Sequence, residues 1–225
     1  MAMVRSGPRC EPSRFGPPNG VGACPFYGSS SLSPISSPRH LLVLDLDETL
    51  VHTSAILKGR CDLVLRNVTM SPGEAPRTCY VHYRPRLIPF LQEAARLFDV
   101  CVFTAGTQPY ADQVLDHIDP SRSVVHYRLY RHHCEAHPGT LGQGYTYVKN
   151  IARLGRPLSQ VIIADNSPVS YQLQPQNGIA VPPWTGEDRK DTFLLGTLMQ
   201  WLRRLATKDD VIPTLAEIGN RTLQP

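Results

Sequence analysis

The sequence predicts an α/β protein in which helices cover both faces of a central, mainly parallel sheet. Two observations support this fold class. Short apolar runs, such as Leu-Leu-Val-Leu at residues 41–44, lack the alternation of a half-exposed strand and are typical of strands buried on both faces. Helical patterns, in which apolar residues recur every three or four positions, lie between these runs, as expected of repeated strand–helix units.

The elements follow in order along the chain. The expected strands lie at residues 41–46, 99–103, 161–164 and 178–181. The expected helices lie at residues 86–97, 109–118, 148–154 and 192–205. After the first strand, a stretch that contains Pro, Gly and two β-rich pieces predicts a small antiparallel flap, inserted at about residues 54–83.

The composition changes near residue 40. Residues 1–39 are crowded with Pro, Gly and Ser and cannot bury enough apolar surface to offset chain entropy, so we expect a disordered leader there. One folded domain is expected at residues 40–215, followed by a C-terminal tail at residues 216–225. No interval between the expected core elements is long enough for a large cap domain.

Several classes of protein are disfavoured by the composition. No apolar run approaches the roughly 20 residues of a membrane helix. The six cysteines form no Cys-x-x-Cys pair, which argues against a disulfide framework and fits a reducing compartment. The net charge is +4, and the four arginines and one glutamate before residue 40 contribute +3 of it. The remaining residues are therefore nearly neutral, and direct nucleic-acid binding is not expected. We expect a soluble monomer in the nucleus or cytoplasm.

Polar residues stand at the ends of three expected strands. Asp45 and Asp47 follow the first, Thr104 follows the second, and Asp165 and Asn166 follow the third. Ligands of open α/β sheets bind outside the carboxyl ends of the strands, so these residues are expected to converge on one crevice. Clustered carboxylates repel one another unless a cation lies among them, and this set of oxygen ligands suits Mg²⁺.

The motifs at these positions resemble those of a known family. Asp45-Leu-Asp-Glu-Thr-Leu-Val51 is similar to the Asp-x-Asp-x-Thr signature of the haloacid dehalogenase superfamily phosphatases. Phe103-Thr-Ala105, Tyr147-Val-Lys149 and Asp165-Asn-Ser-Pro168 follow in order and resemble, more narrowly, the small C-terminal-domain phosphatases and their dullard-type relatives. The resemblance runs from about residue 41 to about residue 211. It implies a three-layer, Rossmann-like haloacid dehalogenase fold.

The resemblance also implies a mechanism. Asp45 would be the nucleophile that forms an aspartyl-phosphate, and Asp47 would be the general acid and base. Thr104 and Lys149 would hold phosphate oxygens, and Lys149 is expected to open a helix whose N-terminus also faces the anion.

The implied metal is Mg²⁺. Its expected ligands are the Asp45 carboxylate, the Asp47 backbone carbonyl, Asn166 and Asp165.

The implied substrate is a phosphorylated serine or threonine in a flexible protein segment. Without a large cap the cleft is expected to be open, with Tyr110 packing against the peptide and Arg131 meeting the phosphate or nearby backbone. The family implies the C-terminal tail of RNA polymerase II as a hypothetical substrate. The Gly-rich stretch at residues 135–146 looks longer than in the relatives, and Gly106 stands where a serine is usual, so substrate preference does not transfer directly.

Two other functions stay open at this point. The same fold serves small-molecule phosphatases, and a catalytically silent domain could bind phosphopeptides, although a binder would not require the whole set of catalytic residues. A zinc site is a further alternative for the cluster of His132, His133, Cys134 and His137. Against it, adjacent histidines of a regular strand do not easily face one ion.

Overall fold

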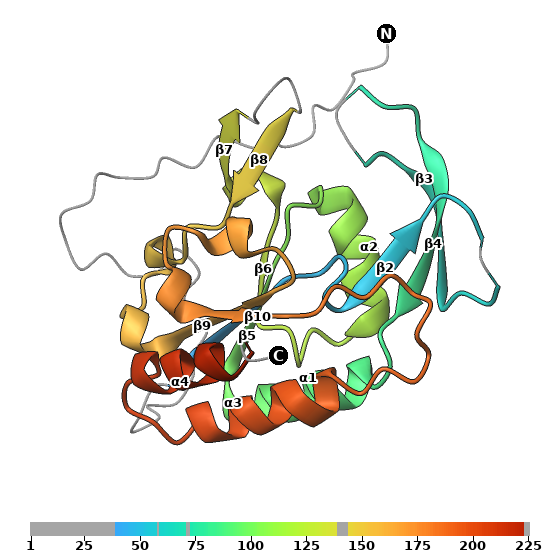
Figure 1. The fold of residues 1–225 in the computed structure, drawn as a ribbon. Helices are drawn as coiled ribbons and strands as arrows, with labels where there is room; N and C mark the ends of the chain where they lie inside the picture. The colour runs from blue at the N-terminus through green and yellow to red at the C-terminus, as the bar shows by residue number, and fades with distance from the viewer. Residues whose placement is uncertain (1–38, 58, 71–72, 139–143, 223–225) are drawn as a thin grey trace, which may run out of the picture.

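A central sheet of five parallel strands organises the protein (Figure 1). The computed structural model describes residues 39–57, 59–70, 73–138 and 144–222. The strand order is β10-β9-β1-β5-β6. The strands are β1 (Leu41–Leu44), β5 (Asp99–Phe103), β6 (Tyr127–Leu129), β9 (Val161–Asp165) and β10 (Gly178–Ala180). All four expected strands are present, and the three-residue edge strand β6 is additional.

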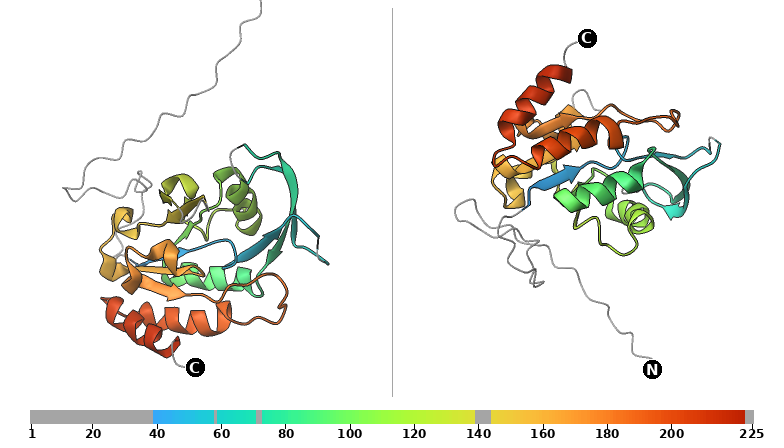
Figure 2. Two further views of the ribbon diagram at one scale, coloured as in Figure 1. Left: turned by 45° about the horizontal axis from the view of Figure 1, so that its top comes forward. Right: turned by 90° about the horizontal axis from the view of Figure 1, so that it is seen from below.

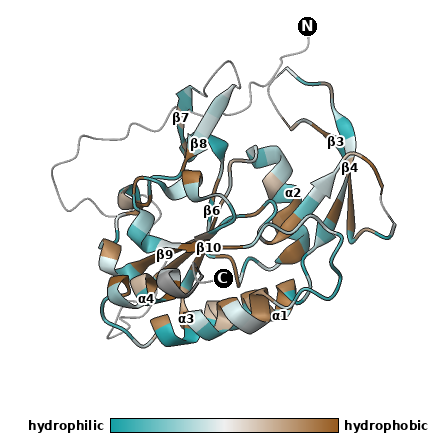
Figure 3. Cartoon of the chain, viewed as in Figure 1, coloured by the Kyte–Doolittle hydropathy of each residue, from teal (hydrophilic) through white to brown (hydrophobic). Residues whose placement is uncertain are grey.

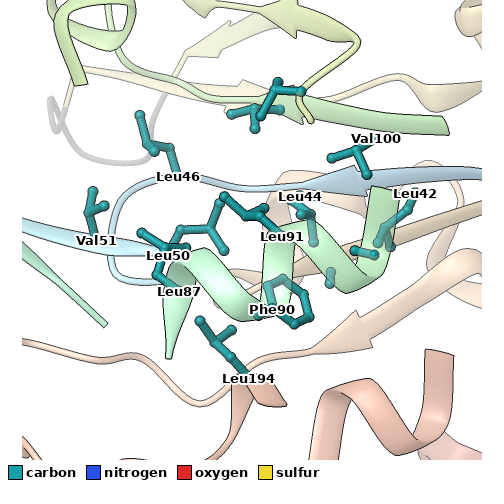
Figure 4. Close-up of a cluster of buried hydrophobic side chains, with 14 of the residues drawn as sticks. Leu42, Leu44, Leu46, Leu50, Val51, Leu87, Phe90, Leu91, Val100 and Leu194 are labelled. Carbon is teal, nitrogen blue, oxygen red and sulfur yellow. The ribbon is translucent and has the colours of Figure 1, made fainter. Parts of the chain in front are cut away.

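One face of the sheet is covered by three α-helices, which are α1 (Leu87–Leu97), α3 (Met199–Leu205) and α4 (Ile212–Thr222). Seen from below in the right-hand view of Figure 2, they lie side by side in front of the sheet. Figure 4 shows Phe90 and Leu91 of α1 against Leu42 and Leu44 of β1, all fully or almost fully buried. Burial of each such side chain contributes roughly 1.5–3 kcal/mol, so this layer is a main source of stability.

The opposite face carries short 3₁₀ helices. Val43, Phe103 and Ile163 point to this side and pack with residues of η3 (Ile151–Leu154) and η5 (Pro168–Tyr171). Because successive residues of β1 enter the two opposite cores, the strand has no polar face. This arrangement confirms the α/β class with a covered parallel sheet, as the apolar runs predict. The remaining 3₁₀ helices are η1 (Arg131–His133), η4 (Leu158–Gln160) and η6 (Pro175–Asn177).

The expected helix at residues 148–154 was wrong. Strand β8 (Tyr145–Val148) pairs antiparallel with β7 (Glu135–Pro138), and only Ile151–Leu154 is helical, as one 3₁₀ turn. The aromatic and β-branched residues of 145–148 favour a strand over a helix, and Gly155 ends the short turn in the left-handed region.

The C-terminal helices also differ from expectation. The helix expected at 192–205 begins as a π-helical segment, η7 (Leu194–Leu198), and continues as α3. Helix α4 crosses the expected domain boundary at residue 215, and Leu215 and Ile218 are buried in the core. Residues 216–222 therefore form part of the domain and not a separate tail. Of the expected leader, residues 1–38 lie outside the described residues.

Two small sheets stand beside the central one. The flap consists of β2 (Val51–Ser54), β4 (Arg77–Tyr83) and β3 (Leu63–Val68), in the order β2-β4-β3, and packs on α2 (Gln108–Ile118). The hairpin consists of β7 and β8. It is mostly pale or teal in Figure 3, whereas the central strands are brown. The flap is the antiparallel insert that the sequence predicts, and no large cap is present among the described residues.

Candidate active site

The loop after β1 aims two carboxylates at the carboxyl end of the sheet. The Asp45 amide donates to the carbonyl of Ala164 at 3.0 Å, so the strand pairing extends to the first carboxylate. The chain then turns, with Glu48 in the left-handed region (φ 61°) and the amide of Leu50 donating to the carbonyl of Leu46 at 2.9 Å. This tight turn places Asp47 beside Asp45 before β2 begins.

Lys149 joins two buried carboxylates. Its Nζ donates to Asp45 Oδ1 and to Asp165 Oδ2, each at 2.6 Å, and its side chain is 1% exposed. Burial alone would favour the neutral amine, but the two carboxylates raise the pKa of Lys149 above its usual value, so it stays charged. Burial raises the pKa of Asp45 to about 7, and the positive charge of Lys149 opposes that rise.

The expected helix N-terminus at Lys149 was wrong. Lys149 directly follows strand β8, and its backbone amide donates to the carbonyl of Ser170 at 2.6 Å. That amide is therefore not available to an anion, and the contribution of Lys149 comes from its ammonium group.

Asp47 is held by two hydroxyl groups. The Tyr110 hydroxyl donates a short hydrogen bond to Asp47 Oδ1, and Thr104 Oγ1 donates to Oδ2 at 3.4 Å. Thr53 Oγ1 lies 2.6 Å from the same Tyr110 hydroxyl. Burial raises the pKa of Asp47, and the hydrogen bond from Tyr110 opposes this. The carboxyl thus has the raised proton affinity that suits a general acid and base.

Tyr110 was expected to pack against the peptide, but it is not exposed at the surface of the cleft. Its side chain is fully buried, with the hydroxyl on Asp47. Thr104, at the end of β5, is also buried, and its Oγ1 accepts a hydrogen bond from the Gly106 amide at 2.8 Å. A Cβ on Gly106 would come within 3.0 Å of the Tyr110 ring and 3.1 Å of Thr104 Oγ1, so the glycine allows a close approach.

The oxygen atoms around Asn166 fit a divalent cation. Its side-chain amide lies 3.2 Å from Asp45 Oδ2 and 3.3 Å from the Asp47 carbonyl oxygen, and its Oδ1 faces both. The Asn166 oxygen can face the oxygens of Asp45 and Asp47 if a cation lies between them. Otherwise the amide turns so that its NH₂ donates to these two oxygens. A carboxylate, a carbonyl and an amide oxygen are ligands that Mg²⁺ prefers.

Asp165 was expected as a metal ligand, but both of its carboxylate oxygens are engaged by other groups. One of its oxygens binds Lys149 and the other accepts from the Ser167 amide at 2.8 Å, so it orients Lys149 and the loop after β9.

The histidine cluster gives no support to the zinc alternative. The rings of His132 and His133 lie 4.0 Å apart, and His133 Nδ1 accepts from the Tyr130 amide at 3.0 Å. Within residues 39–57, 59–70, 73–138 and 144–222, no three His, Cys, Asp or Glu side chains are grouped to hold a metal.

Arg131 lies between the loop after β5 and the hairpin. Its Nε donates to the carbonyl of Ala105 at 2.6 Å, and its guanidinium stacks on the ring of Tyr147, 5.1 Å from the centroid. This places a cation at the base of the hairpin, near Thr104.

Two further residues, Thr49 and Arg84, support the site, and the sequence analysis assigned neither of them to it. Thr49 is fully buried, and its Oγ1 accepts from the Asn166 amide nitrogen of the backbone at 3.2 Å. Its position in the Asp-x-Asp-x-Thr signature was the available signal. Arg84, 1% exposed, donates to the carbonyls of Thr49 (3.2 Å) and Pro182 (3.0 Å) and binds both carboxylate oxygens of Asp191 at 2.8 and 2.9 Å.

Comparison with known proteins identifies relatives over most of the chain. The family described as "NLI interacting factor-like phosphatase" matches residues 40–212. A "Probable C-terminal domain small phosphatase" of Dictyostelium discoideum is 42% identical over 190 residues, which cover 81% of this chain and 57% of the relative. "Phosphatase PSR1" of Saccharomyces cerevisiae is 38% identical, covering 82% and 37%. The human "CTD small phosphatase-like protein" is 40% identical, covering 81% and 62%. The chain thus spans from about a third to about two thirds of the length of these relatives.

A solved structure supports the fold. "The Structure of Fcp1, an essential RNA polymerase II CTD phosphatase" matches with a TM-score of 0.52 and 22% identity, over 83% of this chain and 54% of that one.

Within the described residues, no helix has the length and apolar character needed to cross a membrane.

Proposed function

Because the chain belongs to the NLI interacting factor-like phosphatase family, we propose that it is a Mg²⁺-dependent protein serine/threonine phosphatase that forms an aspartyl-phosphate on Asp45. The observation that carries this proposal is the pairing of two unlike carboxyl groups. Burial raises the pKa of both, but Asp45 is bound to the Lys149 ammonium, whose charge favours the ionised carboxylate, whereas Asp47 is bound to the Tyr110 hydroxyl. A nucleophile and a proton donor need these two environments.

The first half of the reaction transfers the phosphoryl group. A carboxylate oxygen of Asp45 forms a bond to phosphorus while the bond from phosphorus to the serine or threonine oxygen breaks. Asp47 gives its proton to the departing oxygen, which leaves as a neutral hydroxyl group. Tyr110 holds the Asp47 carboxyl in place for this transfer.

The second half restores the enzyme. Asp47 removes a proton from a water molecule as that water attacks the phosphorus of the aspartyl-phosphate. The bond between phosphorus and the Asp45 oxygen breaks, inorganic phosphate leaves, and Asp47 is again protonated. Lys149 neutralises the Asp45 carboxylate that is regenerated, and we assign Lys149, Thr104 and Arg131 to the phosphate oxygens of substrate and product.

The Asp45 carboxylate, the Asp47 carbonyl and Asn166 would hold Mg²⁺. When bound, the ion supplies positive charge that offsets the repulsion between the phosphate and the carboxylates. Asp165 is assigned to orienting Lys149, because both of its oxygens are engaged.

The proposed substrate is a phosphorylated side chain in a flexible protein segment. The flap and the hairpin are small, which supports a cleft open to a protein chain. Relatives named for the C-terminal domain of RNA polymerase II suggest that tail as one substrate, which would place the protein in the nucleus.

Hydrolysis of phosphoserine peptides with and without Mg²⁺ tests the proposal, with a metabolite panel for comparison. We expect metal-dependent phosphate release from peptides that is lost in Asp45→Asn and Asp47→Asn, while circular dichroism shows an intact fold. A fully active Asp45→Asn variant would refute the aspartyl-phosphate mechanism. Preference for the metabolites would refute the protein substrate.

A further inference from the structure

A cavity of about 540 Å³ lies between the flap and the segment after β10, apart from the residues assigned to catalysis. Its lining includes His52, His82 and Arg60 on the flap side and Gly186 and Arg189 on the other. In Figure 1 this second segment is the orange stretch that leaves β10 and passes beside the flap.

The cavity and the proposed active site lie on opposite faces of β2. Neighbouring residues of a strand point to opposite faces. Thr53 contacts the Tyr110 hydroxyl beside Asp47, so His52 and its cross-strand partner His82 face the other way. The cavity nevertheless lies next to the turn that carries Asp47 and Glu48.

His52 provides that connection. His52 Nδ1 lies 2.7 Å from Glu48 Oε1, and Glu48 directly follows Asp47 in the chain. A ligand in the cavity is therefore next to the turn that carries Asp47, on the far side of one strand.

Two guanidinium groups supply the donors of the cavity. The Arg60 side chain makes no hydrogen bond or ion pair with any residue in the described part of the chain, and it is exposed. Arg189 is tethered at one end, since its Nη2 donates to the Arg60 carbonyl at 2.7 Å and lies 2.9 Å from His82 Nδ1. Its Nη1 lies 3.7 Å from Asp62 Oδ2, longer than a hydrogen bond.

The acidic residues of the lining are already engaged. Asp62 Oδ2 accepts from the Tyr83 amide at 2.8 Å and faces Arg189. Glu187 has an interaction partner of its own. Burial, and then the charge of Arg189, lower the pKa of His82, so this imidazole is neutral. The donors that remain for a ligand are the Arg60 guanidinium and the Arg189 Nη1, which forms an ion pair but no hydrogen bond with Asp62.

A ligand with several anionic acceptor oxygens matches this set. Guanidinium groups bind phosphate through paired, charge-assisted hydrogen bonds. We propose that the cavity binds a second phosphorylated side chain of the same substrate segment, so that the preferred substrates carry two phosphates. This inference rests on the proposed function, because it places the first phosphate at Asp45.

Binding to the Asp45→Asn variant tests the site without turnover. Fluorescence anisotropy would compare peptides with one phosphoserine and peptides with two, at separations of about two to eight residues, since an extended chain advances roughly 3.3 Å per residue. We expect one separation to bind about tenfold more tightly than the singly phosphorylated peptide, the difference that about 1.4 kcal/mol gives. Adding Arg60→Gln should reduce this ratio to near one.

Arg66→Gln is the matched control, because Arg66 is an exposed flap arginine outside the cavity lining. It should keep the tenfold ratio. Equal affinity for one and two phosphates at every separation would overturn the proposal. An equal loss in Arg60→Gln and Arg66→Gln would also overturn it, because general charge attraction would then explain the binding.

Free inorganic phosphate is the other source of the same chemical group. If inorganic phosphate shifts the imidazole resonances of His52 in the control but not in Arg60→Gln, and the second peptide phosphate adds no affinity, the peptide assignment is overturned. A wild-type protein that hydrolyses no phosphopeptide would overturn the proposed function alone, since the affinity ratio is measured without catalysis.

Discussion

Lys149→Met removes the only positive charge that the structure shows hydrogen-bonded to Asp45 and Asp165 within its described residues. Methionine fills similar space but leaves two buried carboxylates facing each other. Breaking a buried ion pair by deleting one partner costs about 3–5 kcal/mol, and both Nζ contacts here are 2.6 Å long with side chains 1–9% exposed. We therefore expect the free energy of unfolding to fall by about this amount near pH 8.

The loss should shrink as the pH falls. Burial already raises the pKa of Asp45 to about 7 with Lys149 present, against 3.8 for an ordinary aspartate, and removal of the cation raises it further. A carboxyl group with a higher pKa in the folded state takes up its proton first in that state. Protonation therefore begins to stabilise the folded variant at a higher pH than the folded wild type, so the deficit narrows as the pH drops from about 8 toward about 7.

Urea unfolding followed by circular dichroism at several pH values in this range measures the effect. Lys190→Met, a change at an exposed lysine, is the control and should unfold like the wild type at each pH. A deficit below about 1 kcal/mol, or one that is the same at all pH values, would refute the buried-charge reasoning.

Three further predictions concern residues close to Asp45, Lys149 and Asp165. Tyr110→Phe removes a hydrogen bond that lowers the pKa of Asp47, so the limb of the pH–rate profile that reports Asp47 should move to higher pH; an unmoved limb would contradict that role. Gly106→Ala should lower the free energy of unfolding by about 1 kcal/mol in urea. The reason is that its Cβ would lie 3.0 Å from the Tyr110 ring and 3.1 Å from Thr104 Oγ1. An unchanged unfolding midpoint would show that both side chains move away at no cost and would contradict the prediction. Asn166→Ala should weaken Mg²⁺ binding in calorimetry at least tenfold, whereas unchanged affinity would exclude the amide as a ligand.

The convergence of the site residues was predictable because it depends on topology. Asp45, Thr104 and Asp165 stand at the carboxyl ends of three adjacent parallel strands, and strand ends meet at one edge of a sheet. The apolar runs that form these strands are short and unbroken, so their positions were clear from the sequence. The flap was predicted separately, from two β-rich pieces in a stretch that contains Pro and Gly.

The surroundings of Lys149 and Tyr110 were not predictable in this way. Lys149 reaches the site from the hairpin, and four alternating residues before it read equally well as the start of a helix. Tyr110 is on the first turn of α2, where a sequence pattern gives the face but not the partner of the hydroxyl. Both outcomes depend on contacts between residues far apart in the chain, and local propensity does not encode these.

The buried guanidinium of Arg84 joins segments of the chain that leave the ribosome at different times. It joins the carbonyl of Thr49, 35 residues earlier, to that of Pro182 and the carboxylate of Asp191, 98 and 107 residues later. A nascent chain that ends before Asp191 lacks the counter-charge for Arg84, and an unpaired buried charge is unstable. We therefore expect the turn that carries Asp45 and Asp47 to reach its final form only after the C-terminal part has left the ribosome, so that incomplete chains released early lack the proposed site.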